Sequence, residues 1–196
     1  MLQIKDLHAG YGGSSIIQGV SLQIKAGEKI CILGRNGVGK TTLLKSIMGI
    51  LKPTRGSIIY QGEDITSTKI YRRSRLGLAY VPQGREIFPF LTVKENLLMG
   101  CIARNMSEQE KLIKEILEYF PALGAHLERK GGVLSGGQQQ QLAIARALIS
   151  KPKILFLDEP SEGIQPSVIQ EIIETLIHIQ KEQNLSLLIV EQNLDF

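Results

Sequence analysis

The segment at residues 34–42, GRNGVGKTT, constrains the fold more than any other part of the chain. It contains the pattern G-x-x-x-x-G-K-[ST], which is typical of a phosphate-binding loop. The short apolar run KICILG at residues 29–34 precedes it and has the composition of a strand buried on both faces. Apolar residues at helical spacing follow it at residues 40–51. Because a strand and a helix are the context that this pattern requires, we expect an α/β fold with a phosphate loop.

Each residue of this loop is a candidate for phosphate binding. The set comprises Gly34, Arg35, Asn36, Gly37, Val38, Gly39, Lys40, Thr41 and Thr42. Glycines let the backbone curl so that N–H groups point at phosphate oxygens, and the helix that begins at Lys40 adds its positive end. Lys40 is expected to reach the β- and γ-phosphates, and the Thr41 hydroxyl is expected to bind Mg²⁺. The alternative, a glycine-rich turn that matches by chance, is disfavoured by the flanking strand and helix.

Two carboxylates at the end of another buried strand complete the predicted site. In ILFLDEP, Asp158 follows four apolar residues and can reach magnesium directly or through water. Glu159 comes next and would lie near the γ-phosphate, where a carboxylate can orient and polarise an attacking water as a general base. Without the phosphate loop, two solvated acids at a strand end would be the better interpretation.

The segment LSGGQ at residues 134–138 predicts a second anion-binding element. Ser135, Gly136, Gly137 and Gln138 open the helical run QQQLAIARALI, so their backbone N–H groups lie at a helix N-terminus. One nucleotide cannot easily use two such sites in one chain. A second chain placed head to tail can supply one of them to each nucleotide.

Short buried strands alternate with helices along the chain, which predicts a largely parallel sheet covered on both faces. Two stretches of alternating polarity, at residues 2–9 and 20–28, predict half-exposed strands around the turn-rich GYGGSS. From about residue 92 to residue 128 the pattern changes to amphipathic helices, with Ser107 and Glu110 as a capping box for the second. This block predicts an inserted helical subdomain. The remaining predicted elements are strands at 56–62, 76–83 and 185–192, and a helix at 166–183 that begins with Pro166.

Composition excludes several classes of protein. A hydrophobic content of 43% and a charged content of 21% describe a globular protein, and the net charge of +4 comes from short basic clusters that do not predict a nucleic-acid partner. No apolar run approaches the ~18 residues that cross a bilayer, and no signal peptide opens the chain, so we expect a cytosolic protein. Cys31 and Cys101 lie far apart, and Cys31 stands in an apolar run, which favours a core thiol in a reducing compartment.

In their order and spacing, these motifs resemble those of ABC-type ATPases over essentially the whole chain. The resemblance implies one cassette domain: an α/β P-loop NTPase core with a mostly parallel sheet, N-terminal antiparallel strands and an inserted helical subdomain. The core would comprise residues 1–83 and 146–196, and the subdomain residues 84–145. The resemblance also implies a dimer in which two ATP molecules, with Mg²⁺, lie between the phosphate loop of one subunit and Ser135, Gly136 and Gly137 of the other.

The resemblance assigns further residues. Tyr11 in GYGG matches the aromatic residue that stacks on adenine, although a tyrosine in a turn is the alternative. Gln83 in YVPQ matches the glutamine that senses the γ-phosphate and magnesium and links the core to the helical block. In the family, the neighbourhood at residues 84–97 contacts the membrane subunits. Its Phe88 and Phe90 fit that contact and the core of the subdomain equally well.

Two positions depart from the general family pattern. Gln165 stands where many members have an aspartate in the loop that contacts the opposite subunit, and Gln192 stands where most have a histidine that contacts the γ-phosphate. A glutamine amide can donate a hydrogen bond but cannot shuttle a proton. Gln192 stays a candidate catalytic residue through its amide, but this change disfavours any mechanism in which it acts as an acid or base, and Glu159 is the better candidate for the base.

Three segments narrow the subfamily. VEQN, YVPQGREIFPFLTV and DEPSEGIQPS resemble the ATPases of bacterial branched-chain amino acid importers and, within that group, the urea importers. Because SEGIQPS favours the urea branch, we predict the ATP-hydrolysing subunit of an importer of a small polar solute, urea first and branched-chain amino acids as the alternative. A non-transport ABC protein, or an ATP-binding regulator with little hydrolysis, is the alternative from another class.

The same resemblance implies partners and a place in the cell. We expect transmembrane permease subunits, a sister ATPase or a second copy in the dimer, and a solute-binding protein that acts indirectly. The protein would lie peripherally on the cytoplasmic face of the inner membrane. The family continues past Gln192 with another helix and more strands, so we expect the sequence to be truncated.

Overall fold

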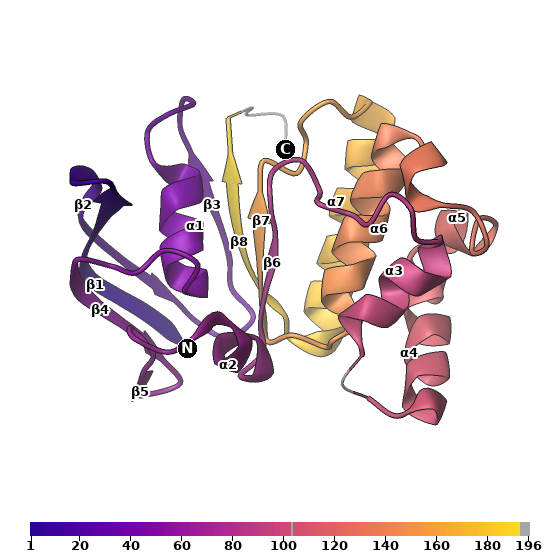
Figure 1. Cartoon of the computed structure of the whole chain (residues 1–196), viewed down its shortest axis with the longest axis horizontal. Coiled ribbons are helices and arrows are strands. Elements are labelled where there is room, and N and C mark those ends of the chain that lie inside the picture. The colour runs from indigo at the N-terminus through magenta and orange to yellow at the C-terminus, as the bar shows by residue number, and fades with distance from the viewer. Residues whose placement is uncertain (103, 193–196) are drawn as a thin grey trace.

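Two four-stranded sheets form the framework of the protein in the computed structural model, which describes residues 1–102 and 104–192 (Figure 1). The antiparallel sheet has the order β2-β1-β4-β5, and the parallel sheet has the order β3-β8-β7-β6. The antiparallel strands are β1 (Leu2–Tyr11), β2 (Ser14–Ile24), β4 (Arg55–Tyr60) and β5 (Glu63–Asp64). The parallel strands are β3 (Lys29–Leu33), β6 (Leu78–Val81), β7 (Ile154–Asp158) and β8 (Ser186–Glu191). The expected combination of sheets is confirmed.

The parallel sheet divides two hydrophobic cores. Along β7, Ile154 and Phe156 join the core that α1 (Lys40–Met48) and the antiparallel sheet share. The alternate residues Leu155 and Leu157 join the core on the other face, with helices α6 (Gly136–Leu148) and α7 (Pro166–Gln183). All four side chains are 0% exposed, and full burial of each contributes about 1.5–3 kcal/mol. The continuous apolar run thus reflects a strand covered on both faces.

Helices fill both sides of this sheet (Figure 1). After α2 (Ile70–Arg75) come α3 (Val93–Gly100), α4 (Met106–Tyr119), α5 (Pro121–Gly124), a 3₁₀ turn (Gly131–Val133), α6 (Gly136–Leu148) and α7 (Pro166–Gln183). The predicted helices are present, and α7 begins at Pro166 as expected. Within residues 1–102 and 104–192, no helix combines the length and the apolar character needed to span a membrane.

The strand predicted at residues 29–34 is present as β3, but the prediction that it is buried on both faces was wrong. This strand lies at the edge of the parallel sheet, where it pairs with β8. Ile30 and Ile32 pack toward the core on the α1 side, but Cys31 and Leu33 point the other way and are exposed. Cys31 is therefore not the core thiol that its apolar neighbours indicated, whereas Cys101 is buried.

The capping box predicted at Ser107 and Glu110 was also wrong. Helix α4 begins one residue before Ser107, and the Asn105 side chain caps it by accepting a hydrogen bond from the Glu108 N–H at 3.0 Å. Asparagine is as good a cap as serine, and its position decides where this helix begins. A capping box does form at α3, between Thr92 and Glu95.

A buried arginine joins α1 to the chain around α2. Arg73 is 1% exposed, and its guanidinium donates hydrogen bonds to the carbonyls of Thr68 (2.9 Å) and Thr66 (2.8 Å). It also donates to the carbonyls of Ser46 (3.0 Å) and Ile47 in the last turn of α1. Burial lowers the pKa of Arg73 to about 10, so the side chain is still charged at neutral pH. Arg73 therefore holds the C-terminal end of the helix that begins at the phosphate loop.

Candidate functional site

The phosphate loop joins β3 to α1, as the sequence predicts. Gly37 and Gly39 have φ values of 81° and 102°, in the left-handed region that favours glycine. A Cβ atom on Gly39 would also lie 3.0 Å from side-chain carbons of Ile16 and Ile17. The β1–β2 hairpin thus packs against the loop so closely that only glycine fits at residue 39.

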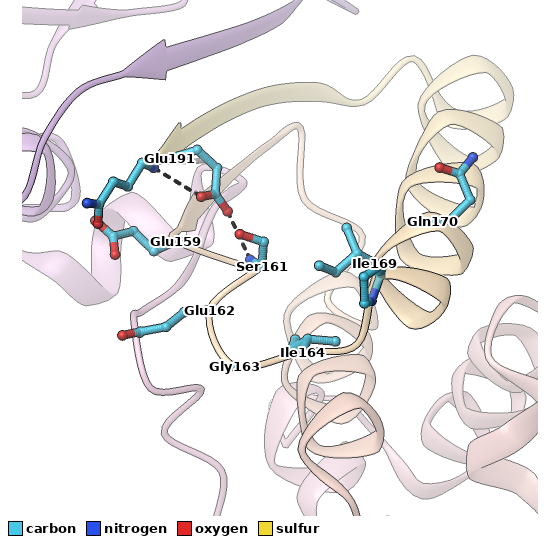
Figure 2. A pocket seen from close by; sticks show the side chains of 10 residues that line it. Glu159, Ser161, Glu162, Gly163, Ile164, Ile169, Gln170 and Glu191 are labelled. Carbon is cyan, nitrogen blue, oxygen red and sulfur yellow. Dashed lines mark hydrogen bonds between the residues drawn. The ribbon is translucent and has the colours of Figure 1, made fainter. Parts of the chain in front are cut away.

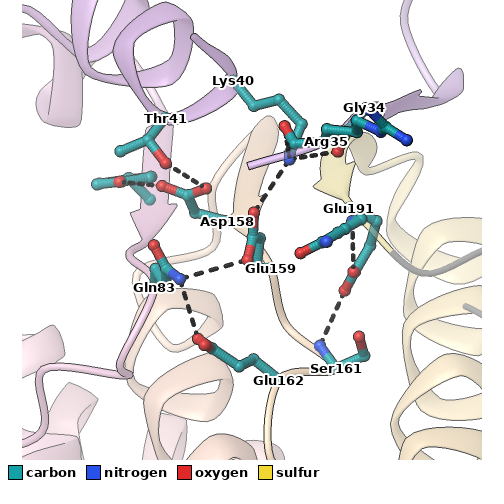
Figure 3. A network of polar contacts seen from close by, with 12 residues as sticks. Gly34, Arg35, Lys40, Thr41, Gln83, Asp158, Glu159, Ser161, Glu162 and Glu191 are labelled. Carbon is teal, nitrogen blue, oxygen red and sulfur yellow. Dashed lines mark hydrogen bonds and ion pairs between the residues drawn. The ribbon is translucent and has the colours of Figure 1, made fainter. Parts of the chain in front are cut away.

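Lys40 lies within the curl of this loop (Figure 3). Its Nζ donates hydrogen bonds to the carbonyls of Gly34 at 2.6 Å and Arg35 at 3.1 Å. The same Nζ lies 3.1 Å from Oε1 of Glu159, and the two side chains are 5% and 9% exposed. The ammonium group that is expected to bind phosphate is therefore adjacent to the expected general base.

Asp158 accepts two hydroxyl hydrogen bonds at the end of β7. Its Oδ1 accepts from the Thr41 hydroxyl at 3.0 Å, and its Oδ2 accepts from the Tyr80 hydroxyl at 2.8 Å. Burial raises the pKa of Asp158, and the two hydroxyl hydrogen bonds oppose that rise. Burial, followed by the charge of Asp158, raises the pKa of Tyr80, so its hydroxyl stays a donor.

The Thr41–Asp158 pair fits a magnesium ion. Hydroxyl and carboxylate oxygens are the ligands that Mg²⁺ prefers, and the ion is usually held by one or two protein groups together with phosphates and water.

Gln83 connects β6 to the loop that follows β7 (Figure 3). Its amide Nε2 donates to Oε2 of Glu159 at 3.3 Å and to Oε2 of Glu162 at 3.1 Å. Glu159 has a left-handed φ of 47°, and its N–H donates to the Val190 carbonyl of β8 at 2.9 Å. The structure therefore brings five predicted residues together: Lys40, Thr41, Gln83, Asp158 and Glu159.

Gln192 lies on the wall of a cavity next to this cluster. The cavity has a volume of about 810 Å³, and Glu159, Glu162, Gly163 and Gln192 contribute to its lining (Figure 2). Gln192 follows directly on β8 and is exposed. It therefore lines the same cavity as Glu159, and its contact with a γ-phosphate stays a prediction.

The residues of LSGGQ lie elsewhere in the chain. Ser135 and Gln138 form a capping box at the start of α6, where the Gln138 N–H donates to the Ser135 hydroxyl at 3.3 Å. Helices α6 and α1 lie on opposite sides of the parallel sheet (Figure 1). The nearest groups to a Cβ on Gly136 would be the Arg85 guanidinium and the Gly163 carbonyl. Within one chain, the two predicted phosphate-binding elements therefore lie apart.

Tyr11 is the last residue of β1, is 47% exposed and pairs with Ser14 of β2. Two residues further along β2, Ile16 and Ile17 pack against the phosphate loop. A tyrosine there can face a nucleotide base beside the loop, and adenine stacking stays a prediction.

Sequence reasoning missed Tyr80, Glu162 and Glu191. Tyr80 lies in β6 next to β7, so its hydroxyl reaches Asp158. Glu191 ends β8, beside the end of β7. Because the carboxyl ends of neighbouring parallel strands meet, the polar residues at the end of the predicted strand at 185–192 were a signal for Glu191. Tyr80 lies inside its predicted strand and carried no such signal.

A second cavity, of about 770 Å³, lies between the sheet and the helical region. Phe88 lines it and is 43% exposed, and nearby Phe90 is 83% exposed, so neither belongs to the core of the helical region. The Arg146 guanidinium lies 5.0 Å from the centre of the Phe88 ring and donates to the Glu86 carbonyl at 2.7 Å. Its other terminal nitrogen, Nη1, is buried without a hydrogen-bond partner among the described residues.

Comparisons with known proteins agree with this geometry. The family model described as ABC transporter matches residues 17–162. The chain is 40% identical over 193 residues to the high-affinity branched-chain amino acid transport ATP-binding protein BraG of Pseudomonas aeruginosa, covering 98% of this chain and 82% of BraG. It is 39% identical over 193 residues to the probable branched-chain amino acid transport ATP-binding protein LivF of Archaeoglobus fulgidus, with the same coverage.

A solved structure has the same fold. It is a dimeric post-hydrolysis state of the ATP-binding cassette MJ0796 bound to ADP and Pi, and it matches with a TM-score of 0.89 and 27% identity. The match covers 100% of this chain and 89% of that one. The α/β cassette architecture expected from the sequence is therefore confirmed.

Proposed function

Because the chain belongs to the ABC transporter family and is an ATPase that couples ATP hydrolysis to transport, we propose that it powers the import of branched-chain amino acids. The observation that carries this proposal is the similarity to BraG and LivF, at 40% and 39% identity over 98% of the chain. Both are named for branched-chain amino acid transport. These relatives favour the alternative solute over urea, for which the comparisons give no support.

The contacts of Lys40 support a specific mechanism for hydrolysis. The loop N–H groups and Lys40 would bind the phosphates of ATP, and Thr41 and Asp158 would hold Mg²⁺. When bound, the ion would neutralise the negative charge of the phosphates. Glu159 contacts the same Nζ that would bind the γ-phosphate, so phosphate can replace Glu159 at Lys40 and leave its carboxylate free to orient the attacking water. Gln83 would transmit this change, because it contacts both Glu159 and Glu162.

The separation of the two phosphate-binding elements supports a head-to-tail dimer. The start of α6, with Ser135, Gly136 and Gly137, would bind the nucleotide held by the phosphate loop of a second chain. That chain would be a sister ATPase or a second copy. The MJ0796 cassette, which matches this fold, is described as dimeric in a state bound to ADP and Pi.

The cavity beside Phe88 fits a contact with permease subunits at the cytoplasmic face of the inner membrane. Apolar side chains of α2, β6 and α3 line it, including Ile70, Val81 and Met99. We keep as part of the proposal the division of the chain into a core (residues 1–83 and 146–196) and a helical subdomain (about 84–145). The cavity would lie where these two parts meet.

We expect the ATPase, assembled with its permease subunits, to be stimulated by leucine presented on its binding protein and not by urea presented in the same way. Occupied binding protein would favour the permease state that closes the ATPase dimer. Phosphate release with each solute measures this. Stimulation by urea alone would overturn the branched-chain assignment and leave the transport ATPase intact. An assembled complex that responds to neither would favour the regulator or non-transport alternatives.

A further inference from the structure

Glu191 is a buried carboxylate that the mechanism above does not use. It is the last residue of β8 and is 1% exposed. In the parallel sheet it lies opposite Leu33, the last residue of β3. A carboxylate in this position is costly to bury unless hydrogen bonds satisfy its oxygens.

Both oxygens of Glu191 accept backbone hydrogen bonds (Figures 2 and 3). Oε1 accepts from the Ser161 N–H at 2.9 Å, and Oε2 accepts from the Gln192 N–H at 3.1 Å. The backbone carbonyl of Glu191 accepts from the Gly34 N–H at 3.1 Å. One residue thus contacts the start of the phosphate loop, the loop after β7 and the residue that follows β8.

Two hydrogen bonds to β8 hold the loop after β7 in place. It begins at Glu159, whose left-handed φ of 47° is uncommon for a residue with a side chain. The bond from the Glu159 N–H to the Val190 carbonyl fixes one side of this turn, and the bond from the Ser161 N–H to Glu191 fixes the other. Without the second bond, only the side-chain contacts of Lys40, Gln83 and Arg85 hold that side of the loop relative to the phosphate loop.

We infer that Glu191 is a positioning residue that holds Glu159 and Gln192 in fixed places relative to the phosphate loop. Although Glu191 contributes to the lining of the first cavity, its side-chain hydrogen bonds among the described residues all go to backbone N–H groups, so we infer that it acts through these neighbours. The inference rests on the proposed role of Glu159 in hydrolysis. Two carboxylate oxygens are needed because two N–H donors from different segments converge on them. A glutamine amide offers one acceptor oxygen and would place its NH₂ group against the other donor.

The test compares E191Q with the unaltered protein. We expect kcat for ATP hydrolysis to fall by about 10- to 100-fold, since small displacements of catalytic groups have effects of this size. KM for ATP should change by less than about twofold, because Lys40 and the backbone bond to Gly34 remain. Hydrogen exchange of the Ser161 and Gln192 amides should accelerate, while amides within β7 and β8 keep their protection.

Two further variants separate positioning from stability. I179V removes a methylene from a side chain that is 1% exposed on α7, far from this loop, and serves as the destabilised control with normal kcat. E191D keeps the charge and both oxygens but is one methylene shorter, so its kcat should lie between those of the unaltered protein and E191Q. E191D also provides the test if E191Q does not fold.

Normal kcat in E191Q, or unchanged exchange at Ser161 and Gln192, would overturn the inference. So would a kcat loss in I179V as large as that in E191Q. If E159Q abolishes turnover while E191Q and E191D do not affect it, only the positioning role fails. If E159Q also leaves turnover unchanged, the proposed mechanism fails with it.

Discussion

Glu159→Gln is expected to lower ATP turnover by about 10²- to 10⁴-fold, the range that a positioned general base contributes. The carboxamide has the shape of the carboxylate but cannot take a proton from the attacking water. Nucleotide binding should persist or strengthen, because the substitution removes a charge that competes with phosphate for Lys40. Phosphate release at saturating ATP and Mg²⁺ measures turnover, and equilibrium titration with a fluorescent ATP analogue measures binding.

Glu162→Gln is the matched control for this variant. Glu162 belongs to the same loop and accepts a hydrogen bond from the same Gln83 amide, at 3.1 Å, but it is exposed and makes no ion pair with Lys40 among the described contacts. We expect its turnover to fall by less than about 10-fold, as for loss of a peripheral hydrogen bond. Full turnover in Glu159→Gln, or equal losses in both variants, would contradict the assignment of Glu159 as the base.

Arg73→Leu is expected to lower the free energy of unfolding by about 3–5 kcal/mol, as when one partner of a buried charged network is removed. The leucine would leave four backbone carbonyls without the donor that they share, two of them at the end of α1. Such a loss is a large fraction of the ~5–15 kcal/mol that stabilises a typical domain. Chemical denaturation followed by circular dichroism measures it.

Arg72→Leu on the same helix provides the comparison. Arg72 is exposed, so its substitution should change stability by less than about 0.5 kcal/mol. Equal effects of the two substitutions would show that the carbonyl contacts of Arg73 do not stabilise the fold.

Four residues of the cluster around Lys40 could be predicted because their sequence signals are local. The phosphate loop places Lys40 and Thr41 by spacing alone, and a run of buried apolar residues places Asp158 and Glu159 at the end of a strand. Residues whose partners lie far along the chain could not be found in this way. Tyr80 contacts a carboxylate 78 residues away, and Glu191 contacts a backbone N–H 30 residues away.

The order of the strands in the parallel sheet could not be predicted from the sequence either. The run that contains Cys31 has the composition of a central strand, but the order β3-β8-β7-β6 places it at an edge. Its burial depends on which strands pair, and local polarity does not encode that pairing. The start of α4 was misplaced for a different reason: Asn105 and Ser107 are both good caps, and local sequence does not rank them.

The preference for urea rested on a few residues around Gln165, which lies just before α7 and forms no contact with the cluster around Lys40 among those described. The similarity to BraG and LivF over 98% of the chain is a broader signal, and it favours branched-chain amino acids.

The molecular mass of the Glu159→Gln protein with ATP and Mg²⁺ tests most directly whether two chains enclose each nucleotide. Light scattering should give twice the mass of one chain with ATP and the mass of one chain with ADP, because the γ-phosphate is the group that Ser135, Gly136 and Gly137 of a second chain would bind. Ser135→Arg in the same background should prevent the increase. A protein that keeps the mass of one chain when ATP saturates its phosphate loop would contradict a head-to-tail dimer of two copies of this chain.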